Sequence, residues 1–374
     1  MDKQRFYVDI HILQTVPPSC VNRDDTGRPK TAVYGGANRA RVSSQAWKHA
    51  VRDYFKDLIS FEKLGYRTKY VKKLIVDSCI NMSSEFDQED YEKAVDEVLK
   101  LKYKRNGKEH TLFDFEDKDK TKVLFFISHK QSQGFAAQMI EDLKKWATEK
   151  EKDKKVKLKD IVDVFEYRKI LSENPSIDLA LFGRMAADDV DLNVDAACQV
   201  AHSISTHVVN NEYDFFTAVD DCDKNGAGHL STMEFNSSTL YRYATINVTD
   251  LKKWIGSDAA DAVKGFTEAF ICSMPTGKQN SYANRTLPDM VYVTVRKDQP
   301  VNLCGAFEKP VVSKEGYIAL SKKALFEHAE RVYDDFCGAP DTSFVVGNES
   351  VLGAEKVSIN VLLDKLSELV SGVV

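Results

Sequence analysis

The chain has 374 residues, of which 43% are hydrophobic and 29% are charged. This length allows about two or three domains, and this composition excludes wholesale disorder, collagen and a small disulfide scaffold. The net charge of −5 argues against a polyanionic partner until its distribution is considered. Residues 21–52 contain seven basic and two acidic side chains, whereas residues 183–271 contain six basic and fourteen acidic ones. The first segment is therefore a candidate contact for a polyanion, and copies of the chain could stack acidic surface toward basic surface.

The seven cysteines lie far apart and form no C-x-x-C pair. Their spacing favours free thiols in a reducing cytoplasm over disulfides or a zinc knuckle. No stretch reaches the roughly 18 consecutive apolar residues of a membrane span, and the first residues lead into a strand-like segment instead of a signal peptide. We therefore expect a cytoplasmic protein with no membrane contact, no cofactor and no metal.

Apolar and polar residues alternate over residues 5–13, which predicts a half-buried strand. Residues 15–42 contain prolines, several glycines and most of the basic cluster, and they are predicted to form one long loop. Ser43 or Ser44 can then cap the N-terminus of a helix that continues to about Leu58.

The next segment, residues 60–182, is rich in charged residues and helix formers, and it is interpreted as a helical insertion. Further helices are predicted at 191–208, 257–273, 321–336 and 357–371. Two extended arms around a glycine-containing turn, 215–221 and 229–235, predict a long hairpin. Strands are predicted at 240–248 and 290–295. This order indicates an α/β (α+β) fold, with a four-stranded sheet carrying helices on one face, as in RNA-recognition modules.

The most informative constellation spans residues 22–52. Its cations alternate with Gly35 and Gly36, which permit close backbone approach, and it ends at a helix N-terminus, where free amides and the helix dipole favour phosphate. These features predict a cradle for a phosphate backbone, since phosphate contacts position a nucleic acid without reading its sequence. The candidate donors are Arg23, Lys30, Arg41, Ser43, Gln45, Lys48 and Arg52.

A second candidate is the loop 275–288, which offers backbone donors together with Lys278 and Arg285. It does not match a nucleotide-binding Walker A loop, because Cys272 and Gln279 stand where glycine and serine or threonine are required. The alternative is a loop that is merely exposed. None of the eight histidines is accompanied by residues that predict a catalytic triad or a metal site, and a structural role is favoured for each.

These motifs resemble the backbone subunit of type I-E CRISPR Cascade complexes. The resemblance rests on Asn22–Asp25, Gly35-Gly36 and the RVSSQ helix start with Lys48. It continues in FGRM (182–185), VAHSISTH (200–207), DFFTAVDD (214–221), GHL–EFNS (228–237) and LYRYATINV (240–248). It covers nearly the whole chain and is weakest in residues 60–180.

The resemblance implies a modified RNA-recognition or ferredoxin-like palm with an inserted helical fingers domain and a β-hairpin thumb. The palm would comprise residues 1–59, 183–211 and 243–374, with the flexible loop 275–288 facing RNA. The fingers would be 60–182 and the thumb 212–242. About six copies would polymerise into a helical filament along the guide part of a CRISPR RNA, beside other Cascade subunits.

The same resemblance implies roles for individual residues. The cations and hydroxyls of 22–52 would hold phosphates, and Lys278 and Arg285 would contact the RNA backbone. Met185, together with Phe216 or Val219 in the thumb, would wedge beside a base displaced about once in six nucleotides. The guide would then pair with a target DNA strand, so the protein would need no base-specific contacts.

Two other functions remain open at this stage. The first is a metal-dependent RNA endonuclease that uses a loop or thumb carboxylate. Its candidate residues are Asp24, Asp25, Asp220, Asp221 and Asp223. The simpler interpretation of Asp24 and Asp25 is that they pair with Arg23 and Arg28 and hold the shape of the loop. The second is a metabolic enzyme with a phosphate-binding loop, which predicts a monomer free of nucleic acid.

Overall fold

The computed structural model describes residues 5–105, 107–186, 189–219 and 227–373. The chain divides into two compact units. Unit 1 comprises residues 1–58, 198–249 and 259–374, and unit 2 comprises 59–197 and 250–258. Unit 2 thus extends to Ala197, beyond the boundary at residue 182 expected for the fingers, and it also takes in a short segment that follows the long strand of unit 1.

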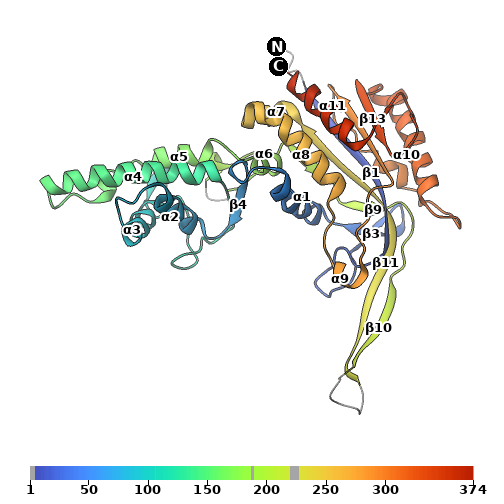
Figure 1. Cartoon of the computed structure of the whole chain (residues 1–374), viewed down its shortest axis with the longest axis horizontal. Helices are drawn as coiled ribbons and strands as arrows, with labels where there is room; N and C mark the ends of the chain where they lie inside the picture. Colours follow the sequence, from blue (N-terminus) through green and yellow to red (C-terminus); the bar gives the residue numbers. More distant parts are fainter. Residues whose placement is uncertain (1–4, 106, 187–188, 220–226, 374) are drawn as a thin grey trace. The chain divides into compact units, whose positions relative to one another are not determined.

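Unit 1 is built on a ten-stranded mixed sheet (Figure 1). The strands follow the order β14-β13-β12-β1-β11-β9-β3-β2, and β8 and β10 also pair with β11. Their bounds are β1 Tyr7–Ser19, β2 Thr31–Tyr34, β3 Ala37–Val42, β8 Cys198–Val200, β9 Ser203–Ser205, β10 Glu212–Val219, β11 Ala227–Asn247, β12 Met290–Arg296, β13 Thr342–Val346 and β14 Glu355–Lys356. The expectation of four strands is wrong because several of these strands have too few residues to produce a recognisable alternation.

The central strand β1 pairs antiparallel with β11 on one side and β12 on the other, so that Ile12 lies opposite both Arg242 and Val291. On one face of the sheet, the guanidinium of Arg242 lies 3.8 Å from the centre of the Trp47 ring of α1. On the other face, Leu13 belongs to an apolar cluster with residues of η5 and α10. Helices therefore cover both faces, and the expectation of helices on one face is wrong.

The helices of unit 1 begin close to where the sequence predicts them. Their bounds are α1 Ser44–Leu58, α8 Ala259–Cys272, α9 Gln279–Tyr282, η5 Leu303–Phe307, α10 Ile318–Val332, η6 Tyr333–Cys337 and α11 Ile359–Ser371. The prediction of a helix at 191–208 is wrong, because β8 and β9 lie within this segment and pair with β11. Pairing with a long neighbouring strand has outweighed an apolar spacing that also fits a helix.

The loop predicted at 15–42 is also only partly correct. β1 continues to Ser19, and β2 and β3 form a hairpin within the predicted loop. The long hairpin is confirmed: β10 pairs antiparallel with β11 and the two strands extend beyond the sheet (Figure 1). The segment predicted as a separate strand at 240–248 is the far end of this same β11. The predicted turn between the two arms falls on 220–226, outside the described residues.

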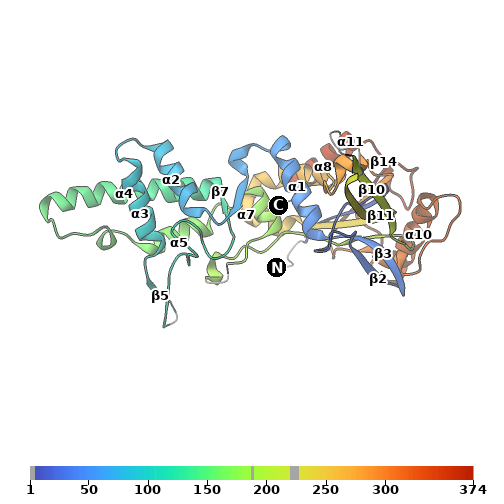
Figure 2. The same cartoon turned by 90° about the horizontal axis from the view of Figure 1, so that it is seen from below.

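Unit 2 is mainly helical, as expected for residues 60–182. Figure 2 shows its longest helix, α4, together with α2, α3 and α5, whose side chains form one apolar core. The bounds are η1 Phe61–Lys63, β4 Gly65–Thr68, α2 Val71–Met82, α3 Gln88–Leu99, β5 Tyr103–Arg105, β6 Lys108–His110, β7 Phe125–Ser128, α4 His129–Lys152, η2 Leu158–Asp160, α5 Val164–Ser172, α6 Ile177–Phe182, η3 Val190–Leu192 and η4 Gly256–Asp258. Helix α7 (Val248–Ile255) begins in unit 1 and ends in unit 2. Among the helices described, none combines the length and apolarity needed to cross a bilayer.

Candidate nucleic-acid interface

The loop after β1 is shaped by one carboxylate. Asp24 Oδ1 accepts hydrogen bonds from the backbone N–H groups of Thr26 and Arg28, both at 2.9 Å, and from the Thr26 hydroxyl at 2.8 Å. The hydroxyl bond from Thr26 is the main cause that lowers the pKa of Asp24, which keeps the carboxylate ionised. Asp24 therefore holds the loop as the simpler interpretation predicts, mainly through amide and hydroxyl donors, and the positive charge of Arg28 has a smaller effect.

Arg28 reaches a different acid, on the hairpin. Its Nε lies 2.8 Å from Glu234 Oε1 on β11, and the other carboxylate oxygen accepts a 3.0 Å hydrogen bond from Asn211. Asn211 in turn accepts a 3.0 Å bond from the side-chain amide of Asn236. This polar chain joins the N-terminal loop to the base of the hairpin, a link that the sequence analysis missed because its members lie about 200 residues apart.

The glycine pair at 35–36 forms a turn, whereas the sequence predicts that it allows the backbone to approach a ligand. Gly35 and Gly36 both have positive φ and form the two-residue turn between β2 and β3. A Cβ on Gly35 would lie 1.7 Å from the Glu308 carbonyl oxygen, so the close approach is to the protein's own backbone. Arg39, counted in the basic cluster, is fully buried and donates to the carbonyl oxygens of Ser205 and Phe307. The close approach at Gly35 is therefore explained by the fold itself, and Arg39 is too deeply buried to contact a phosphate.

Helix α1 starts where the cradle was expected to end. Ser43 Oγ accepts a 3.3 Å hydrogen bond from the Ala46 N–H, so Ser43 caps the helix, and its backbone N–H donates to Asn22 Oδ1 at 2.9 Å. Gln45 is exposed, and Lys48 and Arg52 are half-buried on the same side of α1, at positions i, i+3 and i+7. The helix thus places three long polar side chains beside the loop that Asn22 anchors.

Two hollows adjoin this loop and share Val21 and Asn22. The first, of about 20 Å³, contains both Lys30 and Arg41. Its lining residues are Ser19, Val21, Asn22, Pro29, Lys30, Ala40, Arg41, Val42, Asn236, Ser238 and Leu240. The second, open and about 440 Å³, is lined by Val21, Asn22, Arg23, Asp24, Asp25, Gly27 and Gly277. The structure therefore brings Arg23, Lys30 and Arg41 to adjoining parts of one surface of unit 1.

The loop 275–288 packs against the N-terminal loop. A Cβ on Gly277 would lie 2.1 Å from the Val21 carbonyl oxygen, so only glycine permits this approach. Lys278 contacts Met233 on the hairpin and is close enough to Cys20 to lower the pKa of that thiol, although burial of the thiol has the larger effect and raises it. Arg285 is exposed and donates to the Cys272 carbonyl oxygen at the end of α8. Lys278 thus joins the cationic surface around Arg23, whereas Arg285 lies at the end of α8.

The predicted wedge residues have different surroundings. Met185 lies in unit 2 and is 83% exposed, as a side chain that contacts a ligand must be. Phe216 is half-buried on β10, and the side chain of Val219 lies outside the described residues. Tyr213 and Phe215, on the opposite face of β10, are 69% and 66% exposed and were not singled out from the sequence. The alternation in DFF could have identified them, since neighbouring residues of a strand point to opposite faces.

The carboxylates proposed for a nuclease are only partly described. Asp25 is exposed, and Asp24 is engaged in the loop. Asp220, Asp221 and Asp223 lie outside the described residues. Across the described ranges, no group of three or more His, Cys, Asp or Glu side chains is close enough to hold a metal ion.

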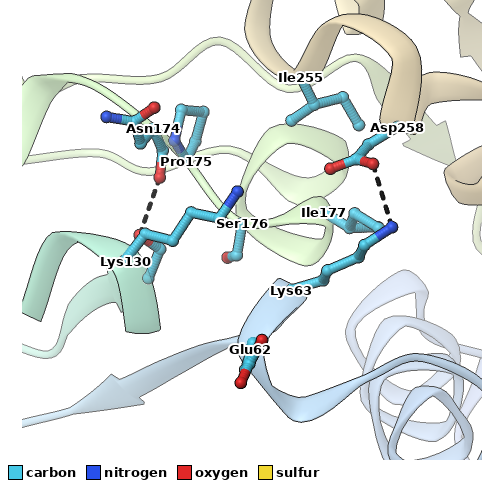
Figure 3. Close-up of a pocket in the computed structure, with 10 residues that line it drawn as sticks. Glu62, Lys63, Lys130, Asn174, Pro175, Ser176, Ile177, Ile255 and Asp258 are labelled. Atoms are coloured by element: carbon cyan, nitrogen blue, oxygen red, sulfur yellow. Dashed lines mark hydrogen bonds and ion pairs between the residues drawn. The ribbon is translucent and has the colours of Figure 1, made fainter. Parts of the chain in front are cut away.

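Unit 2 has a separate small hollow (Figure 3). Lys63 binds Asp258 across it at 3.0 Å, and the Ser128 hydroxyl donates to the Asn174 carbonyl oxygen at 2.9 Å. Its volume of about 20 Å³ is enough for roughly one water molecule. The ion pair between Lys63 and Asp258 therefore joins the short segment 250–258 to the rest of unit 2, and the hollow itself is too small for a substrate.

Comparison with known proteins identifies the family. A model of the CT1975-like protein family matches residues 8–371. The chain belongs to this family. It is also similar to a chain of a solved "CRISPR RNA-guided surveillance complex, pre-nicking", with 33% identity and a TM-score of 0.79, over 97% of this chain and 100% of that one. A chain of a "CRISPR RNA-guided surveillance complex" matches with 29% identity and a TM-score of 0.72, over 97% of this chain and 99% of that one.

These matches confirm the predicted resemblance to a Cascade backbone-type subunit and the mixed α/β fold. The assignment to type I-E stays a prediction. No curated protein matches the chain.

Proposed function

We propose that this protein is a non-catalytic subunit that binds CRISPR RNA in the backbone of a surveillance complex. The observation that carries the proposal is that Arg23, Lys30 and Arg41 line two adjoining hollows on one surface of unit 1. Both hollows include Asn22, whose side chain accepts a hydrogen bond from the Ser43 N–H at the start of α1. Cations, amides and a hydroxyl at a helix start are suited to the phosphodiester backbone of a nucleic acid. The similarity of nearly the whole chain to subunits of RNA-guided complexes supports RNA as the ligand.

The finer features of the proposal follow the resemblance. Unit 1 without its hairpin would be the palm, the hairpin would be the thumb, and most of unit 2 would be the fingers. Arg23, Gln45, Lys48 and Arg52 would extend the phosphate contacts, with Ser43 shaping the helix start, and Lys278 and Arg285 would contribute from the loop 275–288. Met185, Phe216 and Val219 would act beside a displaced base.

In the assembled state, about six copies would polymerise along the guide of a type I-E complex in the cytoplasm, with the thumb kinking the RNA periodically. The guide would pair with the target DNA strand, and other Cascade subunits would bind the ends of the filament. Sequence would be read by base pairing, so the protein would contact mainly the backbone.

The test is to purify the complex formed when the chain is expressed with a CRISPR RNA and its neighbouring subunits, and to digest the bound RNA with a nuclease. We expect a protected guide with regularly spaced accessible nucleotides. Complexes that contain no RNA, or uniform digestion of the guide, would contradict the proposal. Incubation with a complementary RNA and magnesium should leave that RNA intact, and regularly spaced cuts would instead favour the endonuclease.

A further inference from the structure

His202 lies beside the phosphate-binding surface proposed above. It falls between the short strands β8 and β9, and it is exposed where a helical histidine had been expected. The neighbouring strand β3 brings Arg41 to it, with Arg41 paired to Ile204 in the sheet. Lys30, which lines the same hollow as Arg41, is the other cation whose charge acts on the His202 ring.

The contact between the two side chains determines which ring nitrogen of His202 carries the proton. Arg41 Nη1 lies 3.2 Å from His202 Nδ1. A guanidinium has only donors, so the imidazole Nδ1 must accept, and the proton of the neutral ring is then on Nε2. Arg41 Nε meanwhile donates to the Thr31 carbonyl oxygen at 3.3 Å, which fixes the plane of the guanidinium.

Free N–H donors remain on both side chains. Within the described part of the chain, neither Arg41 Nη2 nor His202 Nε2–H has a hydrogen-bond partner. The pair thus offers one charged and one neutral N–H donor beside the hollow that contains Lys30. Because the ring accepts from Arg41 at Nδ1, its Nε2–H points away from the guanidinium, so the two side chains can donate to successive phosphates of one strand.

The charges around His202 keep its ring neutral. Partial burial is the largest cause that lowers its pKa, and the positive charges of Arg41 on β3 and Lys30 on the preceding loop lower it further. Lys48 on α1 is a further cation near this edge of the sheet, where it acts on Cys198 of β8. At pH 7 the ring is therefore a neutral donor that adds no charge to the surface.

We infer that His202 is a further phosphate-binding residue, whose Nε2–H donates to a phosphate next to the one that the Arg41 guanidinium contacts, on the same strand. This inference rests on the proposed function and adds a neutral donor to a set of cations. A neutral donor strengthens binding without releasing a counterion, so its contribution does not depend on salt in the way that a cation's does. A role as a neutral donor also explains why an exposed imidazole lies close to the cations Arg41 and Lys30. These cations would repel a protonated ring but not a neutral one.

The test measures binding of the full chain to a labelled single-stranded RNA between about 50 and 200 mM salt. His202→Phe removes the donor and should weaken binding about tenfold, with the salt dependence unchanged. Arg41→Gln should weaken binding and also reduce the salt slope by about one. His202→Gln keeps an N–H at a similar reach and should restore much of the affinity, whereas the shorter His202→Asn should not.

The chain offers a matched control in a second arginine–histidine pair. Arg331 Nη2 lies 2.8 Å from His328 Nδ1 on α10, and His328→Gln should leave RNA binding unchanged. Wild-type affinity for His202→Phe and His202→Asn, with Arg41→Gln impaired, would overturn the role of His202 and leave the proposed function standing. A reduced salt slope for His202→Phe would show that the ring binds as a cation and would overturn its neutral state.

If His202→Phe does not fold, as judged by its thermal transition, the comparison of His202→Gln with His202→Asn decides, and equal affinities of the two would overturn the inference. Failure of the wild-type chain to bind RNA at any salt concentration would instead count against the proposed function itself.

Discussion

The two units contain similar side chains but use their charges differently. In unit 2 several cations are paired with acids, as in Lys72 and Lys100 with Asp96, and Lys102 with Glu109. In residues 21–52 of unit 1, neither Arg23 nor Lys30 has an acidic partner among the described residues. A count of charges does not separate these two cases. The paired cations of unit 2 are neutralised by their acidic partners, whereas Arg23 and Lys30 can bind an external anion.

The largest effect is expected where pairing in unit 2 is buried. Arg168 Nε and Nη2 bind the two oxygens of Asp189 at 2.7 and 3.0 Å, and the Tyr103 hydroxyl donates to the same carboxylate at 2.8 Å. Burial raises the pKa of Asp189, but the hydrogen bonds from Arg168 and Tyr103 and the charge of Arg168 together lower it by more. The net effect is a lowered pKa. Arg168→Met would leave a buried carboxylate without its cation and should destabilise unit 2 by about 3–5 kcal/mol.

Thermal unfolding of the full chain measures this effect. The matched control is Glu85→Gln, which removes the exposed pair with Lys144 and should cost no more than about 0.5 kcal/mol. Equal effects of the two substitutions would remove the distinction between buried and exposed pairs. The pKa of Asp189 is lower in the folded state than in the unfolded state. The stability that Asp189 contributes should therefore be present near neutral pH and should be lost as the pH falls through its folded-state pKa.

The second prediction concerns the unpaired cations of unit 1. The double variant Lys30→Ala/Arg41→Gln should reduce RNA affinity by on the order of 100-fold and lower the salt slope by about two. The matched double variant in unit 2, Lys100→Ala/Lys102→Ala, removes the same charge from cations that already have acidic partners. It should leave the slope unchanged, and equal slopes for the two double variants would contradict the comparison. Fluorescence anisotropy over a salt series provides the measurement.

A third prediction uses a buried acid of unit 1 whose pKa is shifted in the opposite direction. Burial raises the pKa of Asp9 from 3.8 to about 6, against hydrogen bonds that include those from the Val301 N–H and the Tyr243 hydroxyl. The stability that Asp9 contributes is therefore present below pH 3.8 and is lost as the pH rises through about 6. Asp9→Asn keeps the shape and should stabilise the fold by about 1–3 kcal/mol at pH 8.

The pH dependence is the control for this variant. At pH 4 the carboxyl group of Asp9 is largely protonated in the folded protein, so Asp9→Asn should be close to neutral there. Thermal unfolding at both pH values checks the prediction, and a variant that is destabilised at pH 8 would contradict it.

The smallest effect is expected for Glu234, the acid that pairs with a cation of the basic segment. Its partner Arg28 is 64% exposed, so the pair contributes little to stability. Glu234→Gln removes a negative charge from the base of the hairpin and releases Arg28 for an external anion. We expect a gain in RNA affinity of about two- to fivefold, and a loss would show that Glu234 is needed to orient Arg28.

Much of the candidate site could be predicted because its members are close in the sequence. The cap by Ser43, the side of α1 that carries Gln45 and Lys48, and the basic character of residues 21–52 all depend on spacings of a few residues. The glycine pair shows the limit of this reasoning. The sequence indicates a close approach at Gly35, but the partner is the carbonyl of Glu308, which no local pattern identifies.

The sequence by itself determined the main helices, the long hairpin, the family resemblance and the excess of cations near the N-terminus, because periodicity, capping and composition are local properties. The tertiary structure decided which of those cations remain available. It buried Arg39, paired Arg28 with Glu234 and placed His202 beside Arg41, because ten strands from distant parts of the chain pair in one sheet. Pairing between strands far apart in sequence depends on the packing of the whole sheet, and so the environment of each charge is fixed only when the chain has folded.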